Sequence, residues 1–354
     1  MRFDSMRVAA FGTAAAALFA AGVPAGAAAP STPAAPAPKY HLVKTVVLGG
    51  EGGWDYLAVD AAARRLYLSH GTRVEVLDAD TLKKVGEIPG TEGVHGVALA
   101  PDLGRGFASA GKADQVVIFD LKTLKTLGTV KTGKNPDAIL YEPSTHRVFA
   151  FDGKSQDATV IDGASGKVVG TIGLGGRPEF SATDGAGTVY VNIEDKNQLV
   201  AIDASGLAEK ARWRLAPCEE PSGLAIDAAG KTLFAVCSNK MMAIVDAATG
   251  KVVATPAIGD HADAAAFDPG TGFAFSSNGE GTLTVVARGD DGTYAVAQTV
   301  KTQKGAKTMA LDPKTGRVFL DTAEFGAAPA ATTEQPHPRP SVKPGTFTVL
   351  VFGK

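Results

Sequence analysis

Short runs of alternating apolar and polar residues recur along the chain, each followed by a turn and a second run of the same kind. In "LAVDAAARRLYLS" (57–69), two such runs flank a turn that Asp60 precedes. A period of two predicts a half-buried strand, and two such runs around a tight turn predict a β-hairpin. The pattern occurs seven times, at 57–69, 97–109, 138–150, 181–191, 224–236, 265–275 and 309–320.

The seven hairpins are evenly spaced. The residues that precede their turns are 40 to 44 positions apart: Asp60, Ala100, Glu142, Asp184, Asp227, Asp268 and Asp312. Further pairs of runs follow, as in "RVEVLDADTLKKVGEI" (73–88) and "QVVIFDLKTLKTLGTV" (115–130). A repeated unit of roughly 40 to 45 residues with four strands is typical of a β-propeller blade. The sequence therefore predicts an all-β fold, a single seven-bladed β-propeller of four-stranded blades over residues 40–354.

The two ends of this region complement each other. The seventh unit stops at "TFTVLVFGK" (346–354), which supplies a third strand and no fourth. The run "HLVKTVVLG" (41–49) precedes the first unit and resembles the fourth-strand segment "KVVGTIGLG" (167–175). We expect the N-terminal strand to complete the last blade, which closes the ring and leaves no free sheet edge.

The wording of the repeats resembles a known family. The segments "LKTLGTVKTGKNPDAILYEPSTHRVFA" (124–150) and "GKVVGTIGLGGRPEFSATDGAGTVYVN" (166–192) are similar to the YVTN-type β-propeller repeat of YncE-like exported bacterial proteins. The YVTN tetrad itself is degenerate, as "VYVN" (189–192). The resemblance covers about residues 40–354 and implies a seven-bladed periplasmic or surface protein, although such propellers serve many roles.

The N-terminus has the features of an export signal. Two arginines precede an apolar stretch at 8–23, and three alanines at 27–29 suit cleavage, so we assign 1–29 to a signal peptide and 30–39 to a Pro- and Ala-rich linker. The apolar stretch is shorter than a membrane helix requires. We expect a monomer without a transmembrane segment, located in the periplasm or secreted.

The charge balance narrows the function classes. The chain has 35 Lys and Arg against 37 Asp and Glu and contains no basic block, which argues against binding of duplex nucleic acid. No nucleophile elbow, phosphate-binding loop or dinucleotide fingerprint leads from a strand into a helix. The sequence favours a binding protein over an enzyme.

A column of polar residues recurs five positions before the turn residues. Its members are Asp55, His95, Asp137, Glu179, Ser222, Asp263 and Lys307. Because the first strand of each propeller blade lines the central channel, we expect these side chains at the channel mouth. Glu220 lies just before Ser222, and Trp54 adds aromatic surface beside Asp55. We predict a ligand site there.

A second set lies in the loops between the second and third strands, which open on the same face. From these loops we predict a second ring of metal ligands, formed by His70, Asp152, Glu194, Asn278 and Glu324.

Clustered carboxylates repel one another unless a cation or a basic group lies between them. Ca²⁺ and Mg²⁺ favour oxygen ligands, and histidine adds Mn²⁺ and Zn²⁺ to the candidate cofactors. The plainer alternative is that these side chains hydrogen-bond to loop backbone and that Lys307 neutralises one acid.

Three functions remain open for the mouth. The leading interpretation is a binding protein or interaction scaffold that holds a small molecule, a cation or a protein partner. A bound metal that activates water would instead make the protein a lactonase-like hydrolase. Single-stranded nucleic acid ranks last, because acids dominate the rim and stacking proteins combine aromatic with basic residues.

Two further features bear on the mouth. The loop at 323–345 is far longer than its counterparts and would overhang the mouth, as a partial lid or as an ornament. Pairing around the fifth turn places Ser222 opposite Cys237 with Cys218 a few residues beyond. Both a disulfide and two separate buried thiols fit this arrangement.

Overall fold

The computed structural model describes residues 39–329 and 340–354. The predicted export signal at 1–29 and all of the predicted linker except Lys39 lie outside these residues. The same holds for residues 330–339 of the long loop, so the predicted lid is described only at its two ends.

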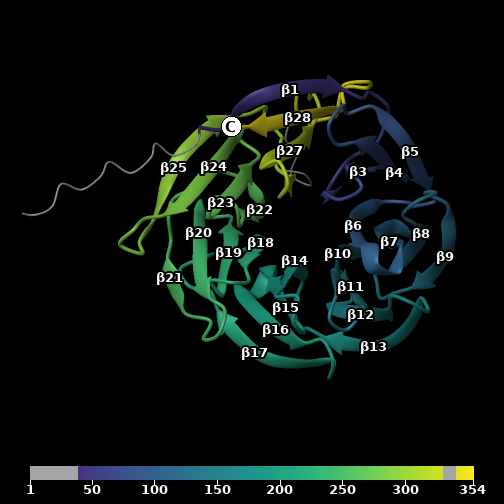
Figure 1. Cartoon of the computed structure of the whole chain (residues 1–354), viewed down its shortest axis with the longest axis horizontal. Coiled ribbons are helices and arrows are strands. Elements are labelled where there is room, and N and C mark those ends of the chain that lie inside the picture. Colours follow the sequence, from purple (N-terminus) through teal and green to yellow (C-terminus); the bar gives the residue numbers. More distant parts are fainter. Residues whose placement is uncertain (1–38, 330–339) are drawn as a thin grey trace, which may run out of the picture. The chain divides into compact units, whose positions relative to one another are not determined.

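The described chain forms seven sheets of four antiparallel strands each, arranged in a ring (Figure 1). Blade 1 consists of β2 (Leu57–Asp60), β3 (Arg65–His70), β4 (Arg73–Asp78) and β5 (Lys84–Pro89). Blade 2 consists of β6 (Val94–Ala100), β7 (Arg105–Ala110), β8 (Gln115–Asp120) and β9 (Thr126–Lys131). Blade 3 consists of β10 (Pro136–Glu142), β11 (Arg147–Asp152), β12 (Asp157–Asp162) and β13 (Lys167–Gly173). Blade 4 consists of β14 (Pro178–Thr183), β15 (Thr188–Ile193), β16 (Gln198–Asp203) and β17 (Ala208–Arg214). Blade 5 consists of β18 (Pro221–Asp227), β19 (Thr232–Cys237), β20 (Met241–Asp246) and β21 (Val252–Ala254). Blade 6 consists of β22 (Ala262–Asp268), β23 (Phe273–Asn278), β24 (Thr282–Arg288) and β25 (Tyr294–Lys301). Blade 7 consists of β26 (Met309–Asp312), β27 (Arg317–Thr322), β28 (Thr348–Gly353) and β1 (His41–Val47). The predicted seven-bladed propeller is confirmed.

The N-terminal strand closes the ring as predicted. β1 pairs antiparallel with β28, from His41 opposite Gly353 to Val47 opposite Thr348. Figure 1 shows the purple β1 lying along the outside of the yellow β28. The last blade therefore contains strands from both ends of the described chain.

The apolar core is divided among the boundaries between blades. Seven clusters of buried side chains each span two neighbouring blades, and together they cover all seven boundaries. The alternation of the strands explains this arrangement, because each face of a blade packs against the next blade. The ring is thus held together by seven comparable interfaces.

The acids that precede the hairpin turns have a structural role. The Asp60 carboxylate accepts hydrogen bonds from the backbone N–H groups of Ala62 and Ala63. Glu142 and Asp312 accept equivalent bonds in their own turns. These carboxylates fix the turns that end the inner strands.

A β-bulge recurs near the start of the inner strands. In blade 3, Pro136 pairs with Asp152, but the next regular pair joins Ile139 to Ala150. Equivalent irregularities occur in blades 2, 4, 5 and 6. A bulge re-aims side chains relative to the pleat of its strand. The residues inside these bulges include five members of the predicted polar column: His95, Asp137, Glu179, Ser222 and Asp263.

The bulge also corrects one predicted pairing. Pro221, rather than Ser222, lies opposite Cys237. The β-bulge places an extra residue between Pro221 and Leu224 and shifts the register by one. Counting pairs outward from the turn without a bulge misses this shift.

Outside the strands, the described ranges contain three single-turn helices, η1 (Pro101–Leu103), η2 (Gly111–Ala113) and η3 (Glu194–Lys196). Within these ranges, no helix has the length and apolar character needed to cross a membrane.

Candidate functional site

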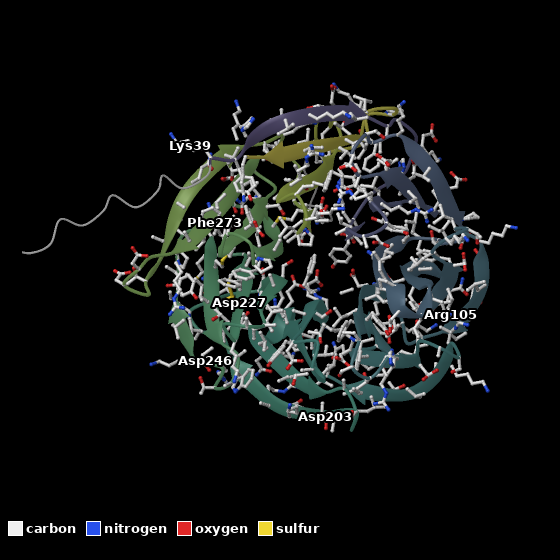
Figure 2. All side chains as sticks on the ribbon, viewed as in Figure 1. Lys39, Arg105, Asp203, Asp227, Asp246 and Phe273 are labelled. Atoms are coloured by element: carbon white, nitrogen blue, oxygen red, sulfur yellow. A yellow bond between two sulfur atoms is a disulfide. The ribbon has the colours of Figure 1, made fainter. Side chains whose placement is uncertain are left out.

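The polar column forms two hydrogen-bonded groups where the inner strands begin. Asp55, His95 and Asp137 come from blades 1 to 3, and Ser222, Asp263 and Lys307 come from blades 5 to 7. Blade 4 contributes Glu179 between them. Figure 2 shows side chains projecting from the inner strands toward the middle of the ring.

In the first group, His95 lies between two carboxylates. Its Nδ1 is 2.7 Å from Asp55 Oδ2 and 3.5 Å from Asp137 Oδ1. The side chains are 27% exposed for His95, 21% for Asp55 and 20% for Asp137, so a small solute can reach them. Within residues 39–329 and 340–354, they form the one group of three His, Cys, Asp or Glu side chains whose ligand atoms all lie within 4.8 Å of one another.

Asp137 is the incompletely satisfied member of this triad. Its Oδ1 is buried and has no hydrogen-bond partner in the described chain. A buried carboxylate oxygen without a partner is costly, and a cation or an ordered water would satisfy it. Burial raises the pKa of Asp137 to about 6; the His95 charge opposes this shift and the Asp55 charge adds to it.

The same two carboxylates also shift the pKa of His95. Burial alone lowers its pKa, but the hydrogen bond with Asp55 and the charge of Asp137 outweigh burial, and the pKa is raised overall. The triad therefore favours a positive charge between its two acids, supplied by the histidine proton or by a cation that replaces it.

In the second group, the negative charge of Asp263 is already neutralised by Lys307. Ser222 Oγ donates to Asp263 Oδ1 over 2.8 Å, and the Lys307 ammonium forms an ion pair with Asp263. Burial lowers the pKa of Lys307, but the charge and hydrogen bond of Asp263 reverse this, so the pKa is raised. Lys307 thus neutralises one acid of the column.

Glu179 lies in an acidic environment between the two groups. Burial, followed by the charges of Asp137 and Glu194, raises its pKa well above the ordinary value. This shift favours the neutral carboxyl, which can donate a hydrogen bond as well as accept one.

Side chains that the sequence analysis missed hold the column in place. Ser109 Oγ donates to the Asp137 carbonyl over 2.6 Å, and Asn192 Nδ2 donates to the Ser222 carbonyl over 2.8 Å. Ser277 donates to the Lys307 carbonyl in the same way. All three occupy the penultimate position of a second strand and reach the bulge or inner-strand start of the next blade.

The penultimate position also supplies a buried acid in blade 7. Asp321 is fully buried and accepts a hydrogen bond from Thr308 Oγ1 over 2.7 Å, while its Oδ2 has no partner in the described chain. Burial raises its pKa well above the ordinary value, which favours the neutral form. The sequence signal for this acid and the supporting side chains is a penultimate strand position that is polar in five of the seven blades: Ser69, Ser109, Asn192, Ser277 and Asp321.

Aromatic side chains gather around Trp54, which precedes Asp55 in the chain. The Trp54 ring lies 5.6 Å from Phe347 and 6.0 Å from Phe325 between centroids. Phe325 pairs with Val342, so the two described ends of the 323–345 loop run antiparallel beside Trp54. The ends of the predicted lid are therefore anchored next to a predicted ligand residue.

The structure does not gather the second predicted ring into one site. Each member has a partner of its own: His70 with Glu75, Asp152 with Thr159, Glu194 with Arg177, Asn278 with Thr284, and Glu324 with Lys343. His70, Asp152 and Asn278 end their strands inside the packed blades, where they are fully buried. These three side chains are hydrogen-bonded within their own blades and are not exposed to the channel.

Asp152 gives a test of this buried environment. Burial raises its pKa to about 7, although the hydrogen bond from Thr159 opposes the shift. In the unfolded chain the value returns to about 4, so between about pH 4 and 7 the folded protein binds more protons. The free energy of unfolding should therefore fall as pH rises through this window, and Asp152→Asn should remove that part of the dependence.

We expect Asp152→Asn to exceed the wild type in stability at pH 8 by about 1 kcal/mol or more. Urea denaturation at pH 5 and pH 8 measures this difference, with the exposed Asp291→Asn as the control. Identical pH dependence in the wild type and Asp152→Asn would contradict the assigned burial.

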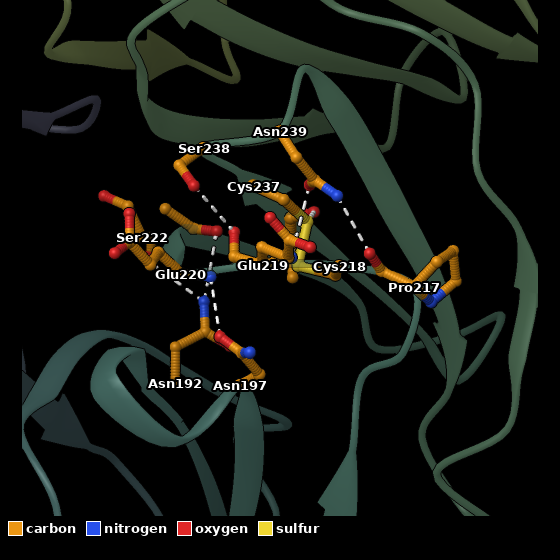
Figure 3. Close-up of a disulfide and its surroundings, with 12 residues drawn as sticks. Asn192, Asn197, Pro217, Cys218, Glu219, Glu220, Ser222, Cys237, Ser238 and Asn239 are labelled. Carbon is orange, nitrogen blue, oxygen red and sulfur yellow. Dashed lines mark hydrogen bonds between the residues drawn. A yellow bond between two sulfur atoms is a disulfide. The ribbon is translucent and has the colours of Figure 1, made fainter.

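Cys218 and Cys237 form a disulfide with a Cα–Cα separation of 5.5 Å (Figure 3). Beside it, Asn239 accepts a hydrogen bond from the Glu219 N–H and donates to the Pro217 carbonyl. Glu220 is exposed, and its N–H donates to Asn197 Oδ1. The disulfide thus fastens the segment that carries Glu220, whose charge helps to raise the pKa of Glu194 after the larger effect of burial.

Comparison with known proteins supports the fold. No family model and no curated protein matches the sequence. Among solved structures, the chain is similar to Kuenenia stuttgartiensis hydrazine synthase, with 18% identity and a TM-score of 0.65, over 76% of this chain and 92% of that one. The likeness is one of propeller fold. At this identity it carries no information about activity, and the resemblance to YVTN-type repeats stays a prediction.

Proposed function

We propose that this propeller is a binding protein whose channel mouth holds a divalent transition-metal ion through Asp55, His95 and Asp137. The observation that supports it is the triad itself, with three ligand atoms within 4.8 Å and one buried Asp137 oxygen that accepts no hydrogen bond in the described chain and meets His95 Nδ1 only at 3.5 Å. A set of one imidazole and two carboxylates suits Zn²⁺ or Mn²⁺ better than Ca²⁺ or Mg²⁺, which prefer oxygen alone.

Binding at this site displaces protons. His95 must release its Nδ1 proton and Asp137 must be ionised before both can act as ligands. Because both pKa values are raised, metal affinity should increase with pH through the neutral range. Glu179 in the next blade supplies a further carboxyl near the ion.

Location and family extend the proposal. We place the binding function in the periplasm or outside the cell, as the signal-like sequence at 1–29 predicts. We also propose that the chain is a divergent member of the YVTN-type propellers, on the strength of the repeats at 124–150 and 166–192.

Calorimetric titration of the chelator-treated protein with Zn²⁺, Mn²⁺, Ca²⁺ and Mg²⁺ tests the site. We expect Zn²⁺ or Mn²⁺ to bind most tightly, and Asp137→Asn to weaken that binding about tenfold or more. Asp263→Asn is the matched control, because Asp263 belongs to the same column but is paired with Lys307. The absence of binding by all four metals, or equal losses in the two variants, would contradict the proposal.

A further inference from the structure

A groove of about 520 Å³ lies between blades 4 and 5. Its walls are the β14–β15 turn, the middle of β17 and the two turns of blade 5 at Ala228 and Ala247. The β14–β15 and β18–β19 turns follow the inner strands, whereas the triad precedes them, so the groove opens at the other end of the blades. It is independent of the metal site.

The groove lies at a boundary that lacks a leucine–glycine contact found at two other boundaries of the ring. The turn between third and fourth strands has one left-handed residue in each of the first five blades: Leu82, Leu124, Gly166, Leu207 and Gly250. In blade 4, Leu207 fills the boundary with blade 3, where a Cβ on Gly170 would lie 2.6 Å from the leucine Cδ1. Leu124 meets Gly86 in the same way.

In blade 3, Gly170 pairs with Val160, and at the equivalent positions of blade 4, Ala211 pairs with Ala201. Ala211 therefore takes the place of the strand glycine at the boundary between blades 4 and 5. Gly250 takes the place of the leucine. No leucine side chain fills this boundary, and Trp213 lies against Gly250 instead, where an added Cβ would be 1.9 Å from the indole Cγ. In blade 3 the position of Trp213 is occupied by Ile172.

The resulting surface is aromatic and apolar. Trp213 and the largely buried Tyr190 line the groove, and six of its thirteen lining residues are alanines, while Asp184 adds a carboxylate at one wall. Small side chains next to two aromatic rings leave room for a flat apolar group, which can stack on the rings and exclude water.

Two lysines at the groove have available charge. Neither Lys210 nor Lys231 forms an ion pair within the described ranges, and Lys210 Nζ donates only to Thr188 Oγ1, over 3.0 Å. The neighbouring acids, one of which lines the groove itself, form no ion pair with either lysine in the described chain, and their carboxylates accept backbone N–H groups of their own turns. Those acids are Asp184, Asp203 and Asp246, of which the last two are labelled in Figure 2.

We propose that this groove binds an organic anion with a flat apolar body, of the class of aromatic carboxylates. The ring system lies against Trp213 and Tyr190, and the carboxylate is held by Lys210 and Lys231. Charge-assisted hydrogen bonds from two ammonium groups give the groove its preference for an anion over a neutral compound of the same shape.

Titration of the whole protein with 2-naphthoate, observed through the ligand's NMR signals, tests the proposal, with neutral 2-naphthamide as the comparison. We expect 2-naphthoate to bind with a Kd of about 1 mM or tighter. The double variant Lys210→Gln/Lys231→Gln should weaken this binding about fivefold or more. Lys125→Gln/Lys167→Gln, on other blades, should leave it unchanged.

A second variant closes the groove. The triple change Ala211→Gly, Trp213→Ile and Gly250→Leu installs the residues found between blades 3 and 4 and should abolish 2-naphthoate binding. Retention of the wild-type circular dichroism shows that this variant folds, and the surface lysine variant tests the charge contribution independently of it. Equal binding of naphthoate and naphthamide, unchanged binding by either the lysine or the triple variant, or no binding to the wild type would overturn the proposal.

Discussion

Replacing both Cys218 and Cys237 with alanine should lower the free energy of unfolding by about 3 kcal/mol. The disulfide closes a loop between residues 19 positions apart, and its loss increases the conformational freedom of the unfolded chain. Both sulfur atoms belong to buried residues in the cluster between blades 4 and 5, so a smaller packing loss adds to this effect. Urea denaturation at equilibrium measures the change.

Reduction provides the control for the cysteine variant. A reducing agent should destabilise the wild type by a similar amount and leave the double variant unaffected. A wild type whose urea midpoint is insensitive to full reduction, verified by thiol titration, would show that the disulfide contributes little. Metal affinity should survive in the variant, because the triad lies on blades 1 to 3.

Truncating Tyr40 should cost about 3 kcal/mol or more, because this residue latches the closing strand to blade 6. Its ring is 1% exposed and meets Phe275 edge-on at 5.1 Å. Its backbone exchanges two hydrogen bonds with the Gln298 side chain, at 2.9 and 2.8 Å. Tyr40→Ala removes the packing and weakens the anchoring of β1, which thermal and urea unfolding would both detect.

Two matched variants separate packing from other causes. The Tyr40 hydroxyl is buried and has no hydrogen-bond partner in the described chain, so Tyr40→Phe should be neutral or slightly stabilising. The neighbouring His41 is exposed, and His41→Ala should change stability by less than about 0.5 kcal/mol. Similar losses in Tyr40→Phe and Tyr40→Ala would contradict the assigned packing role.

The fold was predictable because the same physical signal is repeated seven times. Strand alternation, a turn acid such as Asp60 and a period near 42 residues each agree with a propeller blade. The complementary ends at 41–49 and 346–354 add the closure. The column of mouth residues followed from the same repeat, because equivalent positions in a ring face the same channel.

The pairing within the column was not predictable in the same way. The bulges that aim His95 and Asp137 add a residue without a sequence marker that simple alternation reveals. This is also why the predicted pairing of Ser222 with Cys237 was wrong by one residue. Which acid keeps its charge depends on burial and on neighbours from other blades, such as Lys307 beside Asp263.

The second ring shows where equivalence in the repeat misleads. His70 and Asp152 are polar residues at equivalent strand ends, but those ends lie inside the packed blades. The supporting residues Ser109, Asn192 and Ser277 were overlooked for the opposite reason: small polar side chains in strands resemble spacers. The metal-dependent hydrolase that the sequence leaves open stays a prediction alongside the binding function.

An anomalous difference map from crystals grown with Zn²⁺ tests the metal site most directly. We expect a peak about 2.0–2.2 Å from a ligand atom of each of Asp55, His95 and Asp137 in the wild type, and no peak at that position in Asp137→Asn. A zinc-saturated wild-type crystal with no peak at the triad, or with its only peak elsewhere on the ring, would contradict a metal-binding channel mouth.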